Sequence, residues 1–215
     1  MALATLLILP LYLSYWICSR LASADSALES HSQCLSLFPG SPGNYLRLAF
    51  YRLTLEQCDP TATICFGVLF SKTKARIGQN VYIGPRSMLG WVTLEDDVLL
   101  GPGVQIPSGP HTHGITRLDT PIRNQPGRPN RVSIGRDSWI GAGCIVLADV
   151  DAHCVIGANS TITRPIPAHS IAVGSPAKTI RKRTESEDDA KHLASLCDLE
   201  IQVCLPLIKT NKNIL

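Results

Sequence analysis

The chain has 215 residues, of which 45% are hydrophobic and 17% are charged. This length accommodates one domain with a short appendage, and the apolar content excludes a chain that is disordered throughout. With 20 basic and 17 acidic residues the formal net charge is only +3, which argues against a dedicated nucleic-acid binder. Frequent glycine and proline with few aromatic residues favour a β protein with many turns.

Residues 1–25 form an apolar amino-terminal segment in which positions 2–18 carry no charge. Three interpretations stay open: a membrane span, a signal peptide, and an apolar helix packed on the domain or lying in the membrane interface. Pro10 interrupts the run, and the basic region that should precede a signal peptide is missing. Positions 2–18 are therefore the candidate for membrane association. We expect a cytoplasmic protein, or one attached to the cytoplasmic face, because Arg20 follows the run.

Residues 26–63 are expected to form a linker followed by a short helix. Serine, glycine and proline are frequent up to residue 43, which is typical of a linker. Leu46, Phe50 and Leu53 then recur at helical spacing, which predicts an amphipathic helix over 44–56 that packs on the end of the domain.

From residue 64 an aliphatic residue followed by a small or acidic residue recurs every six positions, as at Ile77-Gly78 and Ile83-Gly84. A period of six fits neither an α-helix nor a coiled coil. Six residues make one short strand and one corner, so three units close a triangular coil, and stacked coils bury one another's inward side chains. The sequence therefore predicts an all-β parallel β-helix of hexapeptide repeats over 64–183.

Two details refine this prediction. Small or β-branched residues four places after the aliphatic ones are also expected to point inward. They are Val81, Ser87, Thr93, Val98, Val104, Ser138, Cys144, Val150 and Ser160. The interval between Ile140 and Ile156 is shorter than three full units, which predicts one shortened turn around Asp149–His153. The tail 184–215 begins with acidic residues and is expected to contain a short carboxyl-terminal helix.

One long break, the loop 107–133, interrupts the rhythm and contains His111 and His113. Long loops on rigid scaffolds tend to be functional. The two histidines could be metal ligands with a third donor such as His153 or His169, or a general base, or surface polar residues, or part of a nucleophilic dyad with a nearby serine. The eight cysteines form no C-x-x-C pair, and we interpret them as reduced, buried thiols without a chemical role.

The stretches WIGAGCIVLADV (139–150) and VIGANSTITRPIPAHSIAVGSPAKTIRKR (155–183) closely resemble the left-handed β-helix acyltransferases. More narrowly, they resemble the galactoside, maltose, xenobiotic and capsular-polysaccharide O-acetyltransferases. The resemblance covers about residues 64–183. It implies left-handed coils, acetyl-CoA as co-substrate without a required metal, and a homotrimer with active sites between neighbouring β-helices.

The resemblance also implies site residues. Members of the family carry the catalytic histidine after a segment like GPGVQIPSGPH, which corresponds to His111 as general base. His113 and Asp119 are assigned to the acceptor side, where Asp119 either orients a histidine or pairs with Arg117 or Arg123. The implied coenzyme contacts are Trp139, Ala142, Ala158, Thr163, Arg164, Lys178 and Arg181.

The expected function is acetyl transfer from acetyl-CoA to a hydroxyl of a sugar or polysaccharide precursor. Acetylation of a small soluble acceptor, such as an antibiotic, a free sugar or serine, is the alternative. Two other classes are a zinc hydratase of the γ-carbonic-anhydrase type and a non-catalytic β-helix module. The polar residues that hold the sugar in galactoside-type members have no clear counterpart before Leu89, so the acceptor cannot be transferred from the resemblance.

Overall fold

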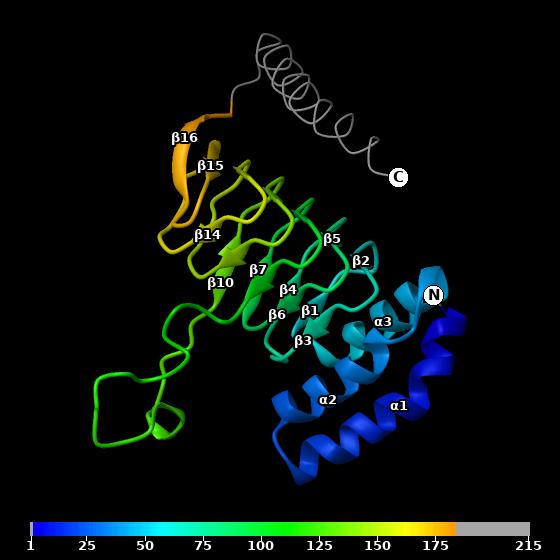
Figure 1. Cartoon of the computed structure of the whole chain (residues 1–215). Helices are drawn as coiled ribbons and strands as arrows, with labels where there is room; N and C mark the ends of the chain where they lie inside the picture. Colours follow the sequence, from blue (N-terminus) through cyan, green and yellow to red (C-terminus); the bar gives the residue numbers. More distant parts are fainter. Residues whose placement is uncertain (1, 184–215) are drawn as a thin grey trace, which may run out of the picture. The chain divides into compact units, whose positions relative to one another are not determined.

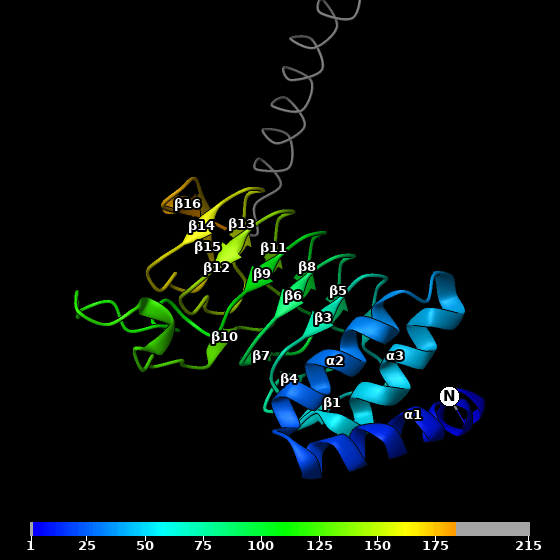
Figure 2. The ribbon, with the colours of Figure 1, turned by 60° about the horizontal axis from the view of Figure 1, so that its bottom comes forward.

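The computed structural model describes residues 2–183, in which a layer of three helices is followed by a triangular parallel β-helix (Figure 1). The helices are α1 (Ala2–Leu21), α2 (Ala24–Ser36) and α3 (Gly40–Thr54). They cover one end of the β-helix, as the second view shows (Figure 2). The helix expected in the tail 184–215 lies outside the described residues.

Each coil contributes one short strand to each of three sheets, which we call A, B and C. Sheet A contains β1 (Gln57–Cys58), β4 (Arg76–Ile77), β7 (Val92–Leu94) and β10 (Val132–Ile134). Sheet B contains β2 (Thr63–Ile64), β5 (Tyr82–Ile83), β8 (Leu99–Leu100), β11 (Trp139–Ile140), β13 (Val155–Ile156), β15 (Ser170–Val173) and β16 (Lys178–Lys182). Sheet C contains β3 (Leu69–Phe70), β6 (Met88–Leu89), β9 (Gln105–Ile106), β12 (Ile145–Val146) and β14 (Thr161–Ile162). Neighbouring strands are parallel except β16, which turns back antiparallel to β15.

The core is a set of aliphatic columns inside the coils, as the six-residue rhythm predicts. In sheet B, Ile64 pairs with Ile83, which pairs with Leu100, and all three side chains are fully buried. The second inward position is occupied by buried small residues such as Ser87 and Ser138, with one exception. Thr93 is partly exposed and Val92 is buried in its place, because β7 has three residues and successive side chains of a strand point to opposite faces.

The coils become shorter along the chain. In sheet B, paired residues mark the start and end of one coil, so the number of residues between them gives the length of the coil. This number decreases in the order Ile64–Ile83, Ile83–Leu100 and Ile140–Ile156. A shortened turn is present, but its short corner is residues 147–149 rather than the predicted 149–153, because Val150 already pairs with Ile134 of the previous coil.

Polar residues in the left-handed backbone region form one edge of the β-helix, between sheets A and B. They are Asn80, Asp97, Asp137, His153 and His169, with φ between 52° and 62°. Asn, Asp and His tolerate this region better than other side chains, so these residues suit corners that glycine would otherwise occupy. The edges are bonded from coil to coil: the His169 N–H donates to the Ala152 carbonyl at 3.0 Å.

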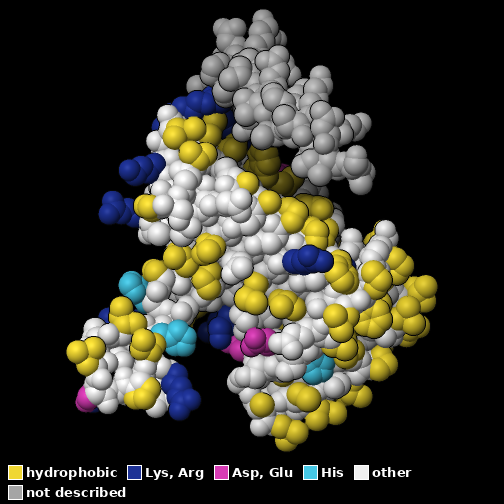
Figure 3. Space-filling model, in the orientation of Figure 1, with side chains coloured by type: hydrophobic (Ala, Val, Ile, Leu, Met, Phe, Trp, Pro, Cys, Tyr) yellow, Lys and Arg dark blue, Asp and Glu magenta, His cyan; other side chains and the backbone are white. Residues whose placement is uncertain are grey.

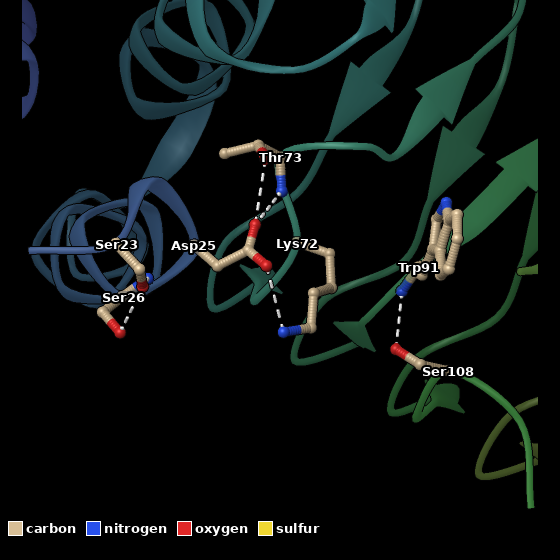
Figure 4. Close-up of polar contacts among 7 residues, drawn as sticks. All are labelled: Ser23, Asp25, Ser26, Lys72, Thr73, Trp91 and Ser108. Atoms are coloured by element: carbon tan, nitrogen blue, oxygen red, sulfur yellow. Dashed lines mark hydrogen bonds and ion pairs between the residues drawn. The ribbon is translucent and has the colours of Figure 1, made fainter. Parts of the chain in front are cut away.

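The prediction of a linker from residue 26 is wrong, because α2 occupies Ala24–Ser36. The serines that suggested a linker make specific bonds. Ser23 caps the helix by accepting from the Ser26 N–H at 3.1 Å (Figure 4), and Ser32 Oγ lies 2.7 Å from Tyr51 Oη and accepts from the Phe70 N–H. The helix predicted over 44–56 begins earlier, at Gly40, since Pro42 is compatible with a first helical turn.

Polar contacts, some of them buried, attach the helix layer to the first coils. Arg47 is fully buried and donates to the carbonyls of Ile64, Leu35 and Phe38 at 3.0, 3.1 and 2.7 Å. The Asp25 carboxylate accepts from the Thr73 N–H at 2.9 Å and pairs with Lys72 at 3.1 Å (Figure 4). The helices and coils are therefore one unit, and the β-helix begins at β1 rather than at residue 64.

The six cysteines among the described residues are free, but the prediction that they are buried is wrong for Cys34, which is exposed, and Cys18, Cys58 and Cys65 are only partly buried. Cys144 and Cys154 are buried inside the coils, and burial raises the pKa of both thiols. Burial also raises the pKa of Cys58 to about 12. These groups are therefore held as neutral thiols, which fits a packing role.

Candidate active site on the loop between β9 and β10

The loop predicted over 107–133 leaves the β-helix after β9 and returns at β10, at the edge between sheets C and A (Figure 1). Ser108 forms its root: the side chain is 4% exposed, and its Oγ accepts from the Trp91 N–H at 2.8 Å (Figure 4). Ser108 and Gly109 both have positive φ, 67° and 84°, which turns the chain outward. The sequence pattern did not single out this anchor.

The outgoing and returning arms of the loop pair with each other. The Asn130 N–H donates to the Ser108 carbonyl at 2.9 Å, and the Arg128 N–H donates to the His111 carbonyl at 2.6 Å. A Cβ on Gly127 would lie 2.1 Å from the Thr112 carbonyl oxygen, so glycine allows this close approach. The backbone of His111 is therefore fixed although the residue lies outside the coils.

Gln125 holds the outer part of the loop together and was not predicted to matter. Its side chain is 6% exposed and donates to the carbonyls of Arg117 and Thr120 at 2.7 and 2.8 Å. Its Oε1 accepts from the Arg117 N–H at 3.0 Å. A single glutamine gives no sequence signal, because its role depends on which carbonyls the fold brings around it.

His111 and His113 open onto the same hollow, which has a volume of about 560 Å³. Both residues are exposed. The hollow is also lined by Arg117, Gln125 and Arg128, and by apolar residues that include Ile115 and Pro126. A mainly apolar lining with a few polar side chains is typical of a site for a small molecule.

Asp119 pairs with Arg117, which decides between the alternatives that the sequence left open. The carboxylate accepts from Arg117 Nε at 3.0 Å and from Nη2 at 2.7 Å. The bond from Arg117 lowers the pKa of Asp119, and the same bond raises the pKa of Arg117. In this structure Asp119 thus pairs with Arg117, and its contact with the acceptor stays a prediction.

The histidines proposed as additional metal donors lie elsewhere. His153 and His169 stack with ring centroids 4.9 Å apart on the edge between sheets A and B, and His153 Nδ1 lies 2.9 Å from the Asp137 carboxylate. The loop leaves from a different edge. Across residues 2–183 no three His, Cys, Asp or Glu side chains are grouped to bind a metal ion.

The structure divides the implied coenzyme residues between two edges of sheet C. Ala142 and Ala158 lie on successive coils at the edge between sheets B and C, where the Asn159 N–H donates to the Ala142 carbonyl. Thr163 and Arg164 follow β14, at the edge from which the loop projects. One chain thus does not bring all these residues together.

The remaining implied coenzyme residues lie in sheet B. Trp139 begins β11 and is 52% exposed. Lys178 and Arg181 belong to β16, where they lie opposite Val173 and Ile171 of β15. Because Val173 is the last residue of β15, Lys178 lies next to the edge between sheets B and C, where Ala142 and Ala158 also lie.

An aromatic and basic cluster surrounds the root of the loop. The guanidinium of Arg131 and the ammonium of Lys74 lie 5.4 and 5.6 Å from the centre of the Trp91 ring. Glu56 bonds to Arg131 at 2.6 Å and also to Arg76. Within the described chain, the Trp91 indole N–H and Arg131 Nε are buried without an acceptor. Such donors are normally satisfied by water or by a ligand oxygen.

Comparisons with known proteins agree with this architecture. Residues 74–107 and 131–164 match the hexapeptide repeat of succinyl-transferase. The galactoside O-acetyltransferase of Lactococcus lactis is 33% identical over 122 residues, which cover 51% of this chain and 56% of that protein. Nodulation protein L of Rhizobium leguminosarum is 44% identical over 108 residues, covering 48% and 55%. The chain thus spans about half the length of the curated relatives it matches.

Solved structures show the same fold. A maltose O-acetyltransferase from Clostridium difficile 630 matches with a TM-score of 0.61 at 20% identity, covering 76% of this chain and 90% of that chain. An N-acyltransferase from Bacillus cereus, solved with dTDP and coenzyme A, matches with a TM-score of 0.51 at 19% identity, covering 62% and 78%. The repeat domain of this chain therefore has the left-handed hexapeptide-repeat β-helix fold seen in a maltose O-acetyltransferase, and it is similar in sequence to galactoside O-acetyltransferases.

Proposed function

We propose that this protein is an acetyl-CoA-dependent O-acetyltransferase that acts on a hydroxyl of a sugar or glycan precursor. The observation that carries the proposal is the position of His111. Its backbone is fixed by Arg128, and the residue lines a hollow on a loop that leaves the coils at the same edge as Thr163 and Arg164, which lie two coils further along the stack. A neutral imidazole in such a place can accept a proton from an alcohol near neutral pH.

The proposed reaction is direct transfer. His111 accepts the hydroxyl proton, the acceptor oxygen attacks the thioester carbonyl carbon, and the carbon–sulfur bond breaks as the new carbon–oxygen bond is completed. The proton then reaches the coenzyme A thiolate. No covalent acyl-enzyme is required, and positioning of two substrates supplies much of the acceleration.

The proposed coenzyme site uses the two groups of residues described above. The small side chains of Ala142 and Ala158 leave room for a pantetheine arm along the edge between sheets B and C. Lys178 and Arg181 would bind its phosphates. Sheet C separates the edge that carries Ala142 and Ala158 from the edge that carries Thr163 and Arg164. We therefore propose that a coenzyme molecule lies between two copies in a homotrimer, where one copy contributes the first edge and its neighbour contributes the second.

The test is release of free coenzyme A thiol by the purified full chain from acetyl-CoA. The acceptor panel contains neutral sugars, phosphorylated sugars, lipid-linked glycans, an amino sugar, an antibiotic and serine. We expect release to require a sugar acceptor and the product to carry an ester. Release only with the amino sugar and formation of an amide would replace the proposal by N-acyl transfer. Unchanged acetyl-CoA with every acceptor would support a non-catalytic module, and carbon dioxide hydration by the zinc-loaded protein would support the hydratase.

A further inference from the structure

The outermost helix of the amino-terminal layer exposes an apolar face that the acyl-transfer proposal does not use. α1 is long and apolar enough to cross a membrane by length and composition, with 19 residues from Leu3 to Leu21 and a mean hydropathy of 1.3. Only 11% of this stretch is buried. Side chains of the exposed half are 45–85% exposed: Leu3, Leu6, Leu7, Leu9, Leu13, Trp16, Ile17 and Leu21.

The other half of α1 is bound to the protein along the helix. Ile8 and Tyr15 are buried, and the Tyr15 ring packs edge-on against Phe50 of α3 at 5.8 Å and against His31 of α2 at 5.9 Å. His31 Nε2 lies 3.1 Å from Ser14 Oγ. To cross a bilayer, α1 would have to leave these partners, so its packing favours a helix that lies parallel to the membrane surface.

Two apolar grooves flank α1 and share the side chains of Leu7 and Leu46. One, of about 400 Å³, lies towards α3 and is lined by Leu3, Pro42 and Tyr45 among others. The other, of about 560 Å³, lies towards α2 and is lined by Pro10, Leu35 and Phe38 among others. Neither lining contains a charged residue. The concentration of hydrophobic side chains over this layer is visible in Figure 3 at the lower right.

The chemistry of this face favours lipid over a protein partner. A protein interface usually has a polar rim and about one hydrogen bond per 100–200 Å². The exposed half of α1 offers almost no polar groups, because Ser14 already bonds to His31 and the only charge is Arg20. The Arg20 guanidinium lies 5.3 Å from the Trp16 ring centre. In a bilayer interface, the guanidinium would meet the anionic headgroups, the tryptophan ring would lie at headgroup level, and the apolar side chains would contact the acyl chains.

We propose that the helix layer binds the surface of an anionic lipid bilayer, with α1 embedded in the interface and the acyl chains entering the two grooves. This site is independent of acetyl transfer. It places the capped end of the β-helix on the membrane.

The experiment is flotation of the purified full chain with sealed vesicles of phosphatidylcholine alone or with phosphatidylserine added. We expect the chain to float with both and more strongly with phosphatidylserine. The double variant Leu6→Glu/Leu13→Glu should lose at least tenfold in partitioning with an unchanged melting temperature, because both residues are exposed. The matched control, Leu118→Glu/Ile122→Glu, adds the same charge on the exposed loop and should float normally.

A second measurement separates an interfacial helix from a spanning one. A protease-cleavable tag placed before Met1 should remain cleavable from outside the vesicles. Protection of the tag would show that α1 spans and would overturn the proposal. Failure of the unaltered chain to float would also overturn it, and a change in oligomeric state of the double variant would then identify the face as a protein interface.

Discussion

The coil stack and the loop that leaves it differ in how each is held. In the stack, corners are bonded to corners of the neighbouring coils, and the inward side chains form buried columns. The loop pairs mainly with itself, through bonds between its two arms and the contacts of Gln125. Stability is therefore concentrated in the repeats, whereas the proposed chemistry lies on a segment that contributes little to the core.

The sharpest test of this division is His111→Ala. Loss of a general base typically lowers turnover by about 10²- to 10⁴-fold, and no core cavity is created because His111 is exposed. We expect turnover to fall by that factor while the melting temperature stays unchanged. His113→Ala changes the acceptor side of the same hollow, so it should raise the KM for the acceptor and retain most of the turnover at saturating acceptor. The opposite result would assign the base to His113.

The reverse effect is expected in the stack. Ile83 is fully buried in the sheet B column, and truncation of a buried isoleucine to alanine costs about 2–5 kcal/mol. Chemical denaturation of Ile83→Ala should show a loss of this size. Leu118→Ala, at the fully exposed tip of the loop, should change the free energy of unfolding by less than about 0.5 kcal/mol. Equal losses in both variants would show that the loop is part of the cooperative core.

Arg181→Ala tests whether the stack also supplies the coenzyme site. A charge-assisted bond to a phosphate is worth roughly 1.5–3 kcal/mol, or about 10- to 150-fold in affinity. We expect the KM for acetyl-CoA to rise at least several-fold, and kcat and the acceptor KM to stay within about threefold, because a distant phosphate contact is equally strong in ground and transition states. The effect should shrink at high salt. Arg136→Ala, on the edge between sheets A and B, is the control. A fall in kcat at an unchanged KM would remove Arg181 from the phosphate site.

The smallest effect is expected where the helix layer meets the stack. Burial raises the pKa of Asp25, but the bonds from Thr73 and Lys72 together lower it by more than burial raises it. The net pKa therefore lies below its ordinary value of 3.8. A carboxylate of this kind stabilises the fold above its unfolded pKa, and the contribution is lost as pH falls through the folded value. Because Asp25 is partly exposed, Asp25→Asn should cost about 1 kcal/mol or less at pH 7. The difference should vanish in acid. A difference that persists at pH 2 would show that charge is not the cause.

The repeats could be predicted from the sequence because their signal is local and repeated. One column position such as Ile83 carries little information, but a series at constant spacing identifies the fold. The helix α2 could not be predicted in this way. Its stability depends on Ser32 reaching Tyr51 and Phe70, and on Arg47 reaching three carbonyls, which are contacts between distant parts of the chain.

The same distinction applies to the candidate site. The break in the rhythm identified the loop, and the resemblance to acyltransferases identified His111. The pairing of Asp119 with Arg117 and the burial of Gln125 depend on the path of the loop, which follows no period. The division of the coenzyme residues between two edges likewise follows from coil geometry rather than from their order in the chain.

The change in coil circumference limits how this architecture can be lengthened or shortened. The coil from Ile64 to Ile83 is longer than the next one, from Ile83 to Leu100, whereas the coil from Ile140 to Ile156 and the one that follows it to Ala172 are equal in length. A duplicate of the segment 140–155 can therefore be inserted between these two coils with every column still in phase. The same segment inserted near β2 would be too short for its neighbour and would displace the inward side chains at a corner. We therefore expect duplication of a whole coil to preserve the buried columns near the carboxyl end of the stack and to disrupt them next to the helix layer.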